Sequence, residues 1–315
     1  MPLIQINAGP EGPELNGARR PLWPTLRHSL RGAGPVIVMV HGYKFQPGDP
    51  HACPHHHILS LSPRDDCRKA VSWPRALGFG GNIPDEGLGI GFGWPARGSL
   101  WNAYRQAACA GRALAALLGM IHDIAPTRPV HAIAHSLGAR VILSALRHPG
   151  LCEGSLNRVI LLSGAAFSSH AEDALCTAAG RAAEIVNVTS RENDVYDFLL
   201  EQLITAPVAG DQAIGSGMPD VGNAVTLQLD QTATRCGLAR AGFAVGPDHA
   251  RMCHWSTYLK PGAFDLYHAL LRRPHEMTLD RLRSALPAMP EPRWSRLRRR
   301  HLRDVPLPMG QKAAS

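Results

Sequence analysis

The fold is decided by one stretch of the chain, Val130-His131-Ala132-Ile133-Ala134-His135-Ser136-Leu137-Gly138-Ala139-Arg140. It begins as a short apolar run, which is typical of a buried strand, and continues into residues with helical spacing. Ser136 therefore stands at a corner between a strand and a helix. So tight a turn needs small residues two positions before and after the serine, because larger side chains would collide with the backbone. Ala134 and Gly138 meet this requirement, so the stretch predicts a strained turn that presents a serine hydroxyl.

Strand-like and helix-like segments alternate on both sides of this corner. The apolar runs that predict strands are residues 36–40, 88–94, 130–134, 158–163 and 185–189. The helical patterns are residues 100–124, 137–146, 171–181, 195–203, 263–272 and 279–286. Such alternation predicts an α/β protein with a mostly parallel central sheet and helices on both faces. In sheets of this kind, ligands bind at the carboxyl ends of the strands.

Composition is typical of a packed globular protein, and the length allows one large α/β domain or two small ones. The 315 residues are 45% hydrophobic and 18% charged, which excludes a disordered chain. We expect a domain over residues 35–286, preceded by an N-terminal extension, 1–34, and followed by a basic Pro- and Arg-rich tail, 287–315. An irregular excursion at 44–87 and a lid-like segment at 205–248 interrupt its pattern. Within the second segment, a strand at 224–229 or 242–245 remains open.

Charge and cysteine usage give expectations about partners and compartment. Much of the net charge of +8 lies between Arg293 and Arg303, so it is a property of a solvated tail and predicts no specific nucleic-acid partner. The seven cysteines are odd in number and unevenly spaced, which favours reduced thiols. Residues 1–13 lack the pattern of a signal peptide, and no apolar run approaches the ~20 residues of a transmembrane segment. We therefore expect a cytoplasmic protein; its oligomeric state is not indicated.

Two backbone groups are candidate donors for an oxyanion hole. The N-terminus of the helix that follows Ser136 favours negative charge, so Leu137 N–H is the first candidate. The second is expected from the turn after the strand at 36–40, at Tyr43 or Lys44.

Four further residues are expected to support this pocket. His41 and Gly42 form the turn before Tyr43, and His41 is expected to shape that loop. His135 directly precedes the serine. Trp94, followed by a proline, is expected at the rim of the pocket.

These motifs resemble the α/β-hydrolase superfamily, especially its bacterial esterase- and lipase-like members, which carry His-Gly after one strand and His-Ser-x-Gly after another. The resemblance covers about residues 35–270 and rests on four separated motifs in the same order. It implies a three-layer sandwich and a triad of serine, acid and histidine in that chain order. It also implies a small-molecule ester as substrate and no cofactor.

The chain order of the triad places the acid after the strand at 185–189. Asp194 is the predicted acid, because it falls where a loop carboxylate reaches a histidine. Asp197, expected inside a helix, and Glu192, nearer the strand end, remain alternatives.

The predicted triad histidine is His254, in Met252-Cys253-His254-Trp255-Ser256-Thr257-Tyr258. His249 is the alternative, whereas His268 falls in an expected helix. In the implied mechanism His254 takes the proton of Ser136, and Asp194 holds the imidazole tautomer.

The resulting prediction is a serine hydrolase that cleaves a carboxylic ester or thioester through an acyl-Ser136 intermediate. A catalytically inactive binding protein and an acyltransferase are the alternatives, because one fold supports many chemistries. His51, the histidines at 55–57 and the cysteines Cys53 and Cys67 have zinc-binding residue types. Their spacing matches no firm ligand pattern, so we predict no metal and interpret the segment as a surface loop or a cap over the site.

Overall fold

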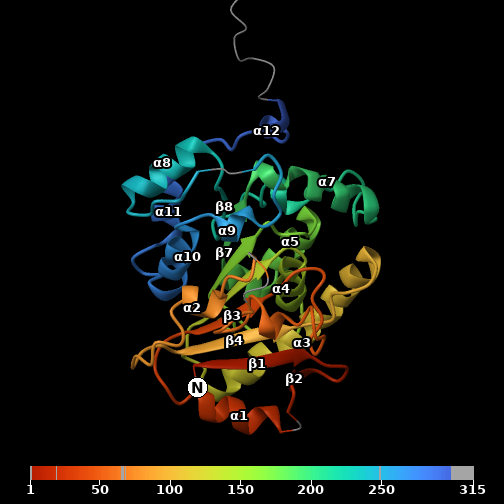
Figure 1. The fold of residues 1–315 in the computed structure, drawn as a ribbon, viewed down its shortest axis with the longest axis vertical. Helices are drawn as coiled ribbons and strands as arrows, with labels where there is room; N and C mark the ends of the chain where they lie inside the picture. Colours follow the sequence, from red (N-terminus) through yellow and green to blue (C-terminus); the bar gives the residue numbers. More distant parts are fainter. Residues whose placement is uncertain (1, 19, 65–66, 68, 248–249, 299–315) are drawn as a thin grey trace, which may run out of the picture.

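The computed structural model describes residues 2–18, 20–64, 67, 69–247 and 250–298. Its centre is an eight-stranded sheet in the order β2-β1-β4-β3-β5-β6-β7-β8 (Figure 1). The strands are β1 Leu3–Ala8, β2 Pro13–Leu15, β3 Val36–Val40, β4 Leu88–Gly93, β5 Val130–His135, β6 Arg158–Leu162, β7 Glu184–Thr189 and β8 Ala224–Gln228. β1 and β2 pair antiparallel, and all other neighbours are parallel.

Helices lie on both faces of the sheet and connect the parallel strands. They are α1 Leu22–Ser29, α2 Trp73–Ala76, α3 Leu100–Ile124, α4 Gly138–Leu146, α5 Ser168–Leu175, α6 Ala178–Ala182, α7 Asp194–Leu203, α8 Thr232–Arg240, α9 Ser256–Leu259, α10 Ala263–Arg272, α11 Leu279–Ala285 and α12 Ser295–Arg298. Together with the sheet they confirm the predicted three-layer α/β sandwich.

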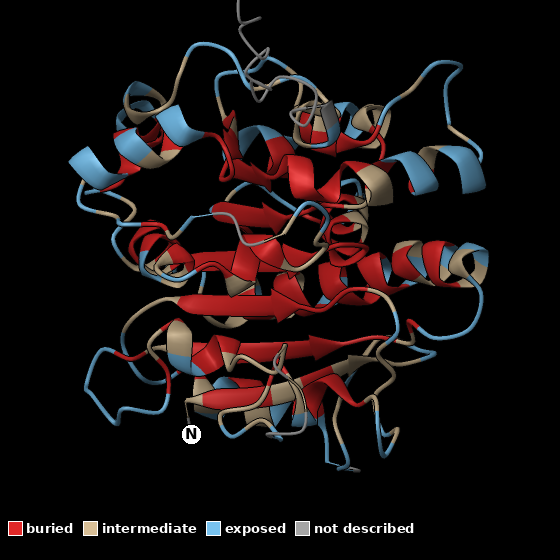
Figure 2. Cartoon of the chain, turned by 45° about the horizontal axis from the view of Figure 1, so that its top comes forward, coloured by how far each residue is buried: buried red, intermediate tan, exposed pale blue. Residues whose placement is uncertain are grey.

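The central strands β3, β4, β5 and β6 are buried on both faces of the sheet (Figure 2). In β3, Val36, Val38 and Val40 face a core that contains residues of α1, α3, α4 and α5. Ile37 and Met39 point the opposite way, into a second core with residues of α2, α8, α10 and α11. Because successive strand residues alternate in direction, a continuous apolar run fills both cores.

Within the part of the chain that the structure describes, α3 is the one helix whose length and apolar composition would allow it to span a membrane. Half of its most apolar 18-residue window is buried in the protein. Leu114, Leu117 and Leu118 belong to the same core as α4. The apolar residues of α3 thus form the packing face of a core helix.

The N-terminal residues belong to the sheet, which corrects the prediction of a separate extension at 1–34. β1 pairs in parallel with β4, and β2 forms the edge of the sheet. Ile4 and Ile6 of β1 are buried in the core. The strand is hard to detect in the sequence because its polar residues, Gln5 and Asn7, leave only a short alternation.

Two other segments differ from their predicted organisation. The lid-like segment at 205–248 contains β8 and α8, so it completes the sheet, and the strand lies at the first of the two predicted positions. The helix predicted at 171–181 is divided into α5 and α6. The division occurs at Thr177, whose hydroxyl accepts the Gly180 N–H at 2.9 Å and begins a new helix.

Candidate active site

The turn between β5 and α4 is strained, as its sequence predicts. Ser136 has φ of 55°, in the left-handed region that few residues other than glycine adopt. A Cβ on Gly138 would lie 2.7 Å from the carbonyl oxygen of His41, and one on Gly42 would lie 2.8 Å from Cβ of Ser136. Glycine is therefore required at both positions to bring the β3 and β5 turns together.

Ser136 and His254 meet at the carboxyl edge of the sheet. The Ser136 hydroxyl lies 2.8 Å from Nε2 of His254, which comes from the segment directly before α9. Burial lowers the pKa of His254 well below its ordinary value of 6.5, and the neighbouring His135 and Lys69 lower it further. The imidazole is therefore neutral at pH 7, and Nε2 can accept the hydroxyl proton.

The other nitrogen of the imidazole contacts an amide. Nδ1 of His254 donates to Oδ1 of Asn193 at 2.6 Å, and Nδ2 of Asn193 donates to Oδ1 of Asp197 at 2.9 Å. Asn193 and Asp197 are 2% and 3% exposed. A continuous chain of hydrogen bonds thus runs from Ser136 through His254 and Asn193 to Asp197.

Asp197 is the carboxyl group at the end of this chain. It lies in the first turn of α7, and burial raises its pKa to about 7, although Arg191 and Arg293 oppose the shift. Gly215 leaves room for it, because a Cβ there would lie 2.0 Å from Oδ2 of Asp197. The carboxyl group therefore changes charge near neutral pH.

Asp194 does not contact His254, which corrects the predicted triad. Its Oδ2 accepts the Trp294 N–H at 2.6 Å, and its Oδ1 lies 3.3 Å from the Arg191 guanidinium. The physical reason is a 3-10 turn, Arg191–Asn193, immediately before α7. This turn directs Asn193 toward the histidine and the next side chain, Asp194, toward the C-terminal segment.

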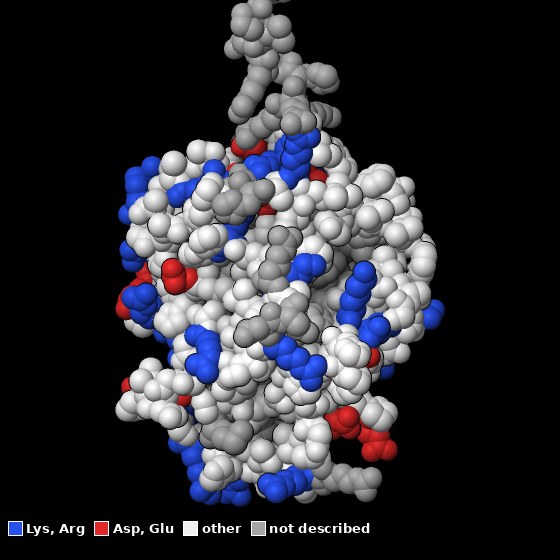
Figure 3. All heavy atoms as spheres, viewed as in Figure 1, with Lys and Arg blue, Asp and Glu red and all other residues white. Residues whose placement is uncertain are grey.

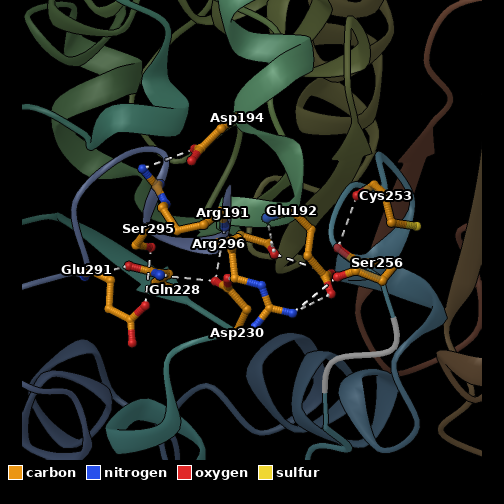
Figure 4. A network of polar contacts seen from close by, with 12 residues as sticks. Arg191, Glu192, Asp194, Gln228, Asp230, Cys253, Ser256, Glu291, Ser295 and Arg296 are labelled. Carbon is orange, nitrogen blue, oxygen red and sulfur yellow. Dashed lines mark hydrogen bonds and ion pairs between the residues drawn. The ribbon is translucent and has the colours of Figure 1, made fainter. Parts of the chain in front are cut away.

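Glu192, the other predicted alternative, is also engaged elsewhere. Its carboxylate lies 3.5 Å from Lys260 and 3.4 Å from Arg296. Its backbone carbonyl accepts the Cys253 N–H at 2.9 Å, next to His254. Glu192 thus helps to hold the histidine segment beside the β7 turn, while its side chain faces the network in Figure 4.

The network in Figure 4 joins the ends of β7 and β8 to the C-terminal segment. Asp230 accepts the Arg191 N–H at 3.0 Å and lies 3.8 Å from the Arg296 guanidinium. Arg293 pairs with Glu201 of α7 at 2.9 Å. Buried charges are stable only when paired. The prediction of a solvated tail is therefore wrong for Arg293 and Arg296; residues 299–315 lie outside the described residues.

The β3 turn is braced by His41 and Trp94. Trp94 N–H donates to Nε2 of His41 at 3.0 Å, and the Trp94 indole N–H donates to the His41 carbonyl at 2.9 Å. Burial lowers the pKa of His41 to about 3, so the ring stays neutral and accepts this hydrogen bond. Trp94 is fully buried behind His41. Its predicted place at the rim of the pocket is therefore wrong.

The candidate oxyanion donors lie at the two turns that meet at Ser136. Leu137 directly precedes the N-terminus of α4, where a free N–H favours an anion. Lys44 N–H donates to the Ala96 carbonyl at 2.8 Å, which leaves Tyr43 as the candidate from the β3 turn.

His254 is enclosed by aromatic rings. The His135 ring lies 4.6 Å from it, and Nε2–H of His135 donates to the His254 carbonyl at 2.9 Å. Tyr196 of α7 stacks on the imidazole at 4.6 Å. Neither Tyr196 nor Asn193 was predicted from the sequence to be a site residue. Helical spacing places Tyr196 beside Asn193, but no sequence pattern separates Asn193 from the adjacent Asp194.

A cavity of about 600 Å³ opens above Ser136. Its walls come from α7, the start of α3, the segment around His254 and the excursion between β3 and β4. His51 and His57 line it, whereas His55 is buried and its Nε2 lies 2.7 Å from Asn7 Oδ1. Within the described residues no group of three or more His, Cys, Asp or Glu could hold a metal ion. His249 lies outside those residues.

The family model described as "Alpha/beta hydrolase of unknown function (DUF900)" matches residues 25–164. The match contains the β3 turn and Ser136, while Asn193, Asp197 and His254 lie beyond its end. No curated protein matches the chain.

Proposed function

Because the chain belongs to the α/β-hydrolase superfamily, we propose that it is a serine hydrolase that cleaves a carboxylic ester or thioester through an acyl-Ser136 intermediate. The observation that carries the proposal is the chain of hydrogen bonds from Ser136 to Asp197 at the floor of the cavity. A nucleophile, a base within hydrogen-bond distance and a group that orients the base are the parts that nucleophilic catalysis requires.

Acylation begins when Oγ of Ser136 attacks the carbonyl carbon and Nε2 of His254 takes the hydroxyl proton. The N–H groups of Leu137 and Tyr43 stabilise the oxyanion of the tetrahedral intermediate. The bond to the leaving oxygen or sulfur then breaks, and His254 gives that atom its proton. Deacylation repeats these steps with water as the nucleophile, which releases the acid and restores Ser136.

Asn193 and Asp197 divide the role that one carboxylate has in the usual triad. The amide oxygen of Asn193 fixes the tautomer with a proton on Nδ1, as asparagine does in Cys-His-Asn proteases. It carries no charge, so it stabilises the imidazolium only as a dipole. Asp197 supplies the negative charge behind Asn193, at the end of the hydrogen-bond chain.

The test is labelling with a fluorophosphonate probe, followed by mass spectrometry of the peptides. We expect wild-type protein to be labelled at Ser136, and Ser136→Ala and His254→Ala to lose the label while circular dichroism shows that both variants are folded. Folded wild-type protein that remains unlabelled would favour a binding protein that retains the hydrolase fold.

A further inference from the structure

The cavity above Ser136 is lined by leucines on one side, while on the other two lysines stand among aromatic and other apolar residues. Leucine side chains from α7 and the start of α3 form the apolar wall; they are Leu100, Leu199, Leu200 and Leu203. Two ammonium groups, those of Lys44 and Lys69, come from the excursion between β3 and β4. We propose that the substrate is an ester or thioester whose leaving group is anionic, with a carboxylate or phosphate that Lys69 and Lys44 bind. This inference rests on the proposed function and deepens it.

Lysine is rare in this chain but enriched in the lining of the cavity. It contains four lysines and 29 arginines, and two of the four lysines line this cavity, whereas none of its described lining residues is arginine. A lysine presents a compact charge on a flexible stem, which suits a mobile substrate group. Half of the lysines of this chain therefore line the cavity that a substrate would enter.

The two ammonium groups have no carboxylate partner among the described residues, and neither takes part in an ion pair there. The one carboxyl group among the described lining residues is Asp197, which is buried and bonded to Asn193. Across the middle of the face in Figure 3, Lys and Arg side chains are visible, and Asp and Glu lie mainly toward the edges. Among the described lining residues, the cavity thus presents two lysines and one buried carboxyl group to an entering anionic group.

Lys69 lies on the side of the cavity where the leaving group must be. Its Nζ is 3.2 Å from the ring centroid of Trp255, and this ring is 5.8 Å from that of His254. His254 must reach the leaving atom to protonate it, so the leaving group occupies the same side of Ser136. The acyl chain then points to the leucine wall.

The experiment compares two chromogenic esters with the same acyl chain, 4-nitrophenyl hexanoate and 3-carboxy-4-nitrophenyl hexanoate. The measured quantity is the ratio of their kcat/KM values, anionic over neutral, so that general effects of a substitution cancel. We expect Lys69→Met to lower this ratio about tenfold and Lys69→Arg to lower it less. Added salt should lower the ratio of the wild-type protein.

Arg105→Met is the matched control, because Arg105 is an exposed cation on α3 outside the cavity and should leave the ratio unchanged. A ratio that stays constant in Lys69→Met, while Ser136 is labelled normally, would overturn the anionic leaving group and leave the hydrolase proposal intact. Failure of labelling at Ser136 would reject the hydrolase itself. If both esters react too slowly, the two phenols can be compared instead. The measured quantity is then how strongly 3-carboxy-4-nitrophenol and 4-nitrophenol each protect Ser136 from the fluorophosphonate probe.

Discussion

The turn after β5 and the turn after β7 both place a functional side chain at the carboxyl edge of the sheet, but they are specified differently. At the first turn, Ser136 stands between two small residues, Ala134 and Gly138, that its backbone requires. At the second, Asn193 and Asp194 are adjacent polar residues of similar shape, and either one would satisfy a local pattern. Local sterics therefore identify the nucleophile from the sequence, whereas contacts with distant segments determine which residue supports His254.

Those distant contacts come from the C-terminal segment and from β8. Trp294 N–H and the Arg191 guanidinium hold Asp194 away from the histidine. Asp230, which follows β8, fixes the backbone of Arg191 at the start of the 3-10 turn. The orientation of Asn193 is thus decided by residues about 40 and 100 positions further along the chain.

The largest expected effect concerns His254, the base that contacts Ser136 of the first turn. His254→Ala should lower kcat for an activated ester by about 10⁴-fold, because the Ser136 hydroxyl loses the base that lies 2.8 Å from it. Steady-state hydrolysis of 4-nitrophenyl hexanoate measures it. His275→Ala, which removes an exposed histidine, serves as the control and should retain wild-type kcat. Equal rates for both variants would mean that His254 is not the base.

Two substitutions at the second turn test whether Asn193 or Asp194 supports the histidine. Asn193→Ala should lower kcat about 10²-fold, because the imidazole loses the group that fixes its tautomer. Asp194→Ala should instead lower the free energy of unfolding by about 1–3 kcal/mol, because Trp294 N–H and Arg191 lose a buried partner. Ester hydrolysis and urea denaturation of both variants separate the two effects. The opposite pattern would restore Asp194 as the triad acid.

A smaller effect, about tenfold on kcat at pH 8, is expected for Asp197→Asn. The substitution keeps an acceptor for Asn193 and removes the charge. Because burial raises the pKa of Asp197 to about 7, wild-type kcat should rise as pH increases through about 7. His254 is already neutral there, since its pKa lies well below 6.5. The pH profile of the variant should lack this step, and an unchanged step would assign it to another group.

A double-mutant comparison separates the electrostatic role of Asp197 from a purely structural one. Asn193→Asp would place a carboxylate directly on His254, so Asp197→Asn should cost much less activity in that background than in the wild type. An equal loss in both backgrounds would indicate that Asp197 acts only through the stability of α7.

The smallest expected effect is at the first turn. Ala134→Gly keeps a small residue two positions before Ser136 but frees the backbone of a buried strand, so the free energy of unfolding should fall by about 0.5–1 kcal/mol with little change in kcat. Urea denaturation and ester hydrolysis measure these quantities. A gain in stability would show that the methyl group of Ala134 strains the turn.

Much of the fold could be predicted because buried strands and amphipathic helices leave strong local patterns. β3, β5, β6 and β7 lie where continuous apolar runs predict them. The sequence did not reveal β1 and β2. β2 is an edge strand of only three residues, and the polar residues of β1 leave only a short alternation. It also did not reveal that Arg293 and Arg296 form ion pairs with the rest of the protein. An arginine-rich sequence is the same whether its side chains are solvated or paired.

The sequence alone determined the layered α/β architecture and the strained turn at Ser136, because these follow from apolar periodicity and backbone sterics. Its resemblance to the α/β-hydrolases added the prediction of His254 as the histidine that meets Ser136. Only the tertiary structure decided which polar residue supports His254, where the carboxyl group of Asp197 lies and which cations face the cavity. These choices depend on hydrogen bonds and ion pairs between segments far apart in the chain, and such contacts leave no periodic pattern in the sequence.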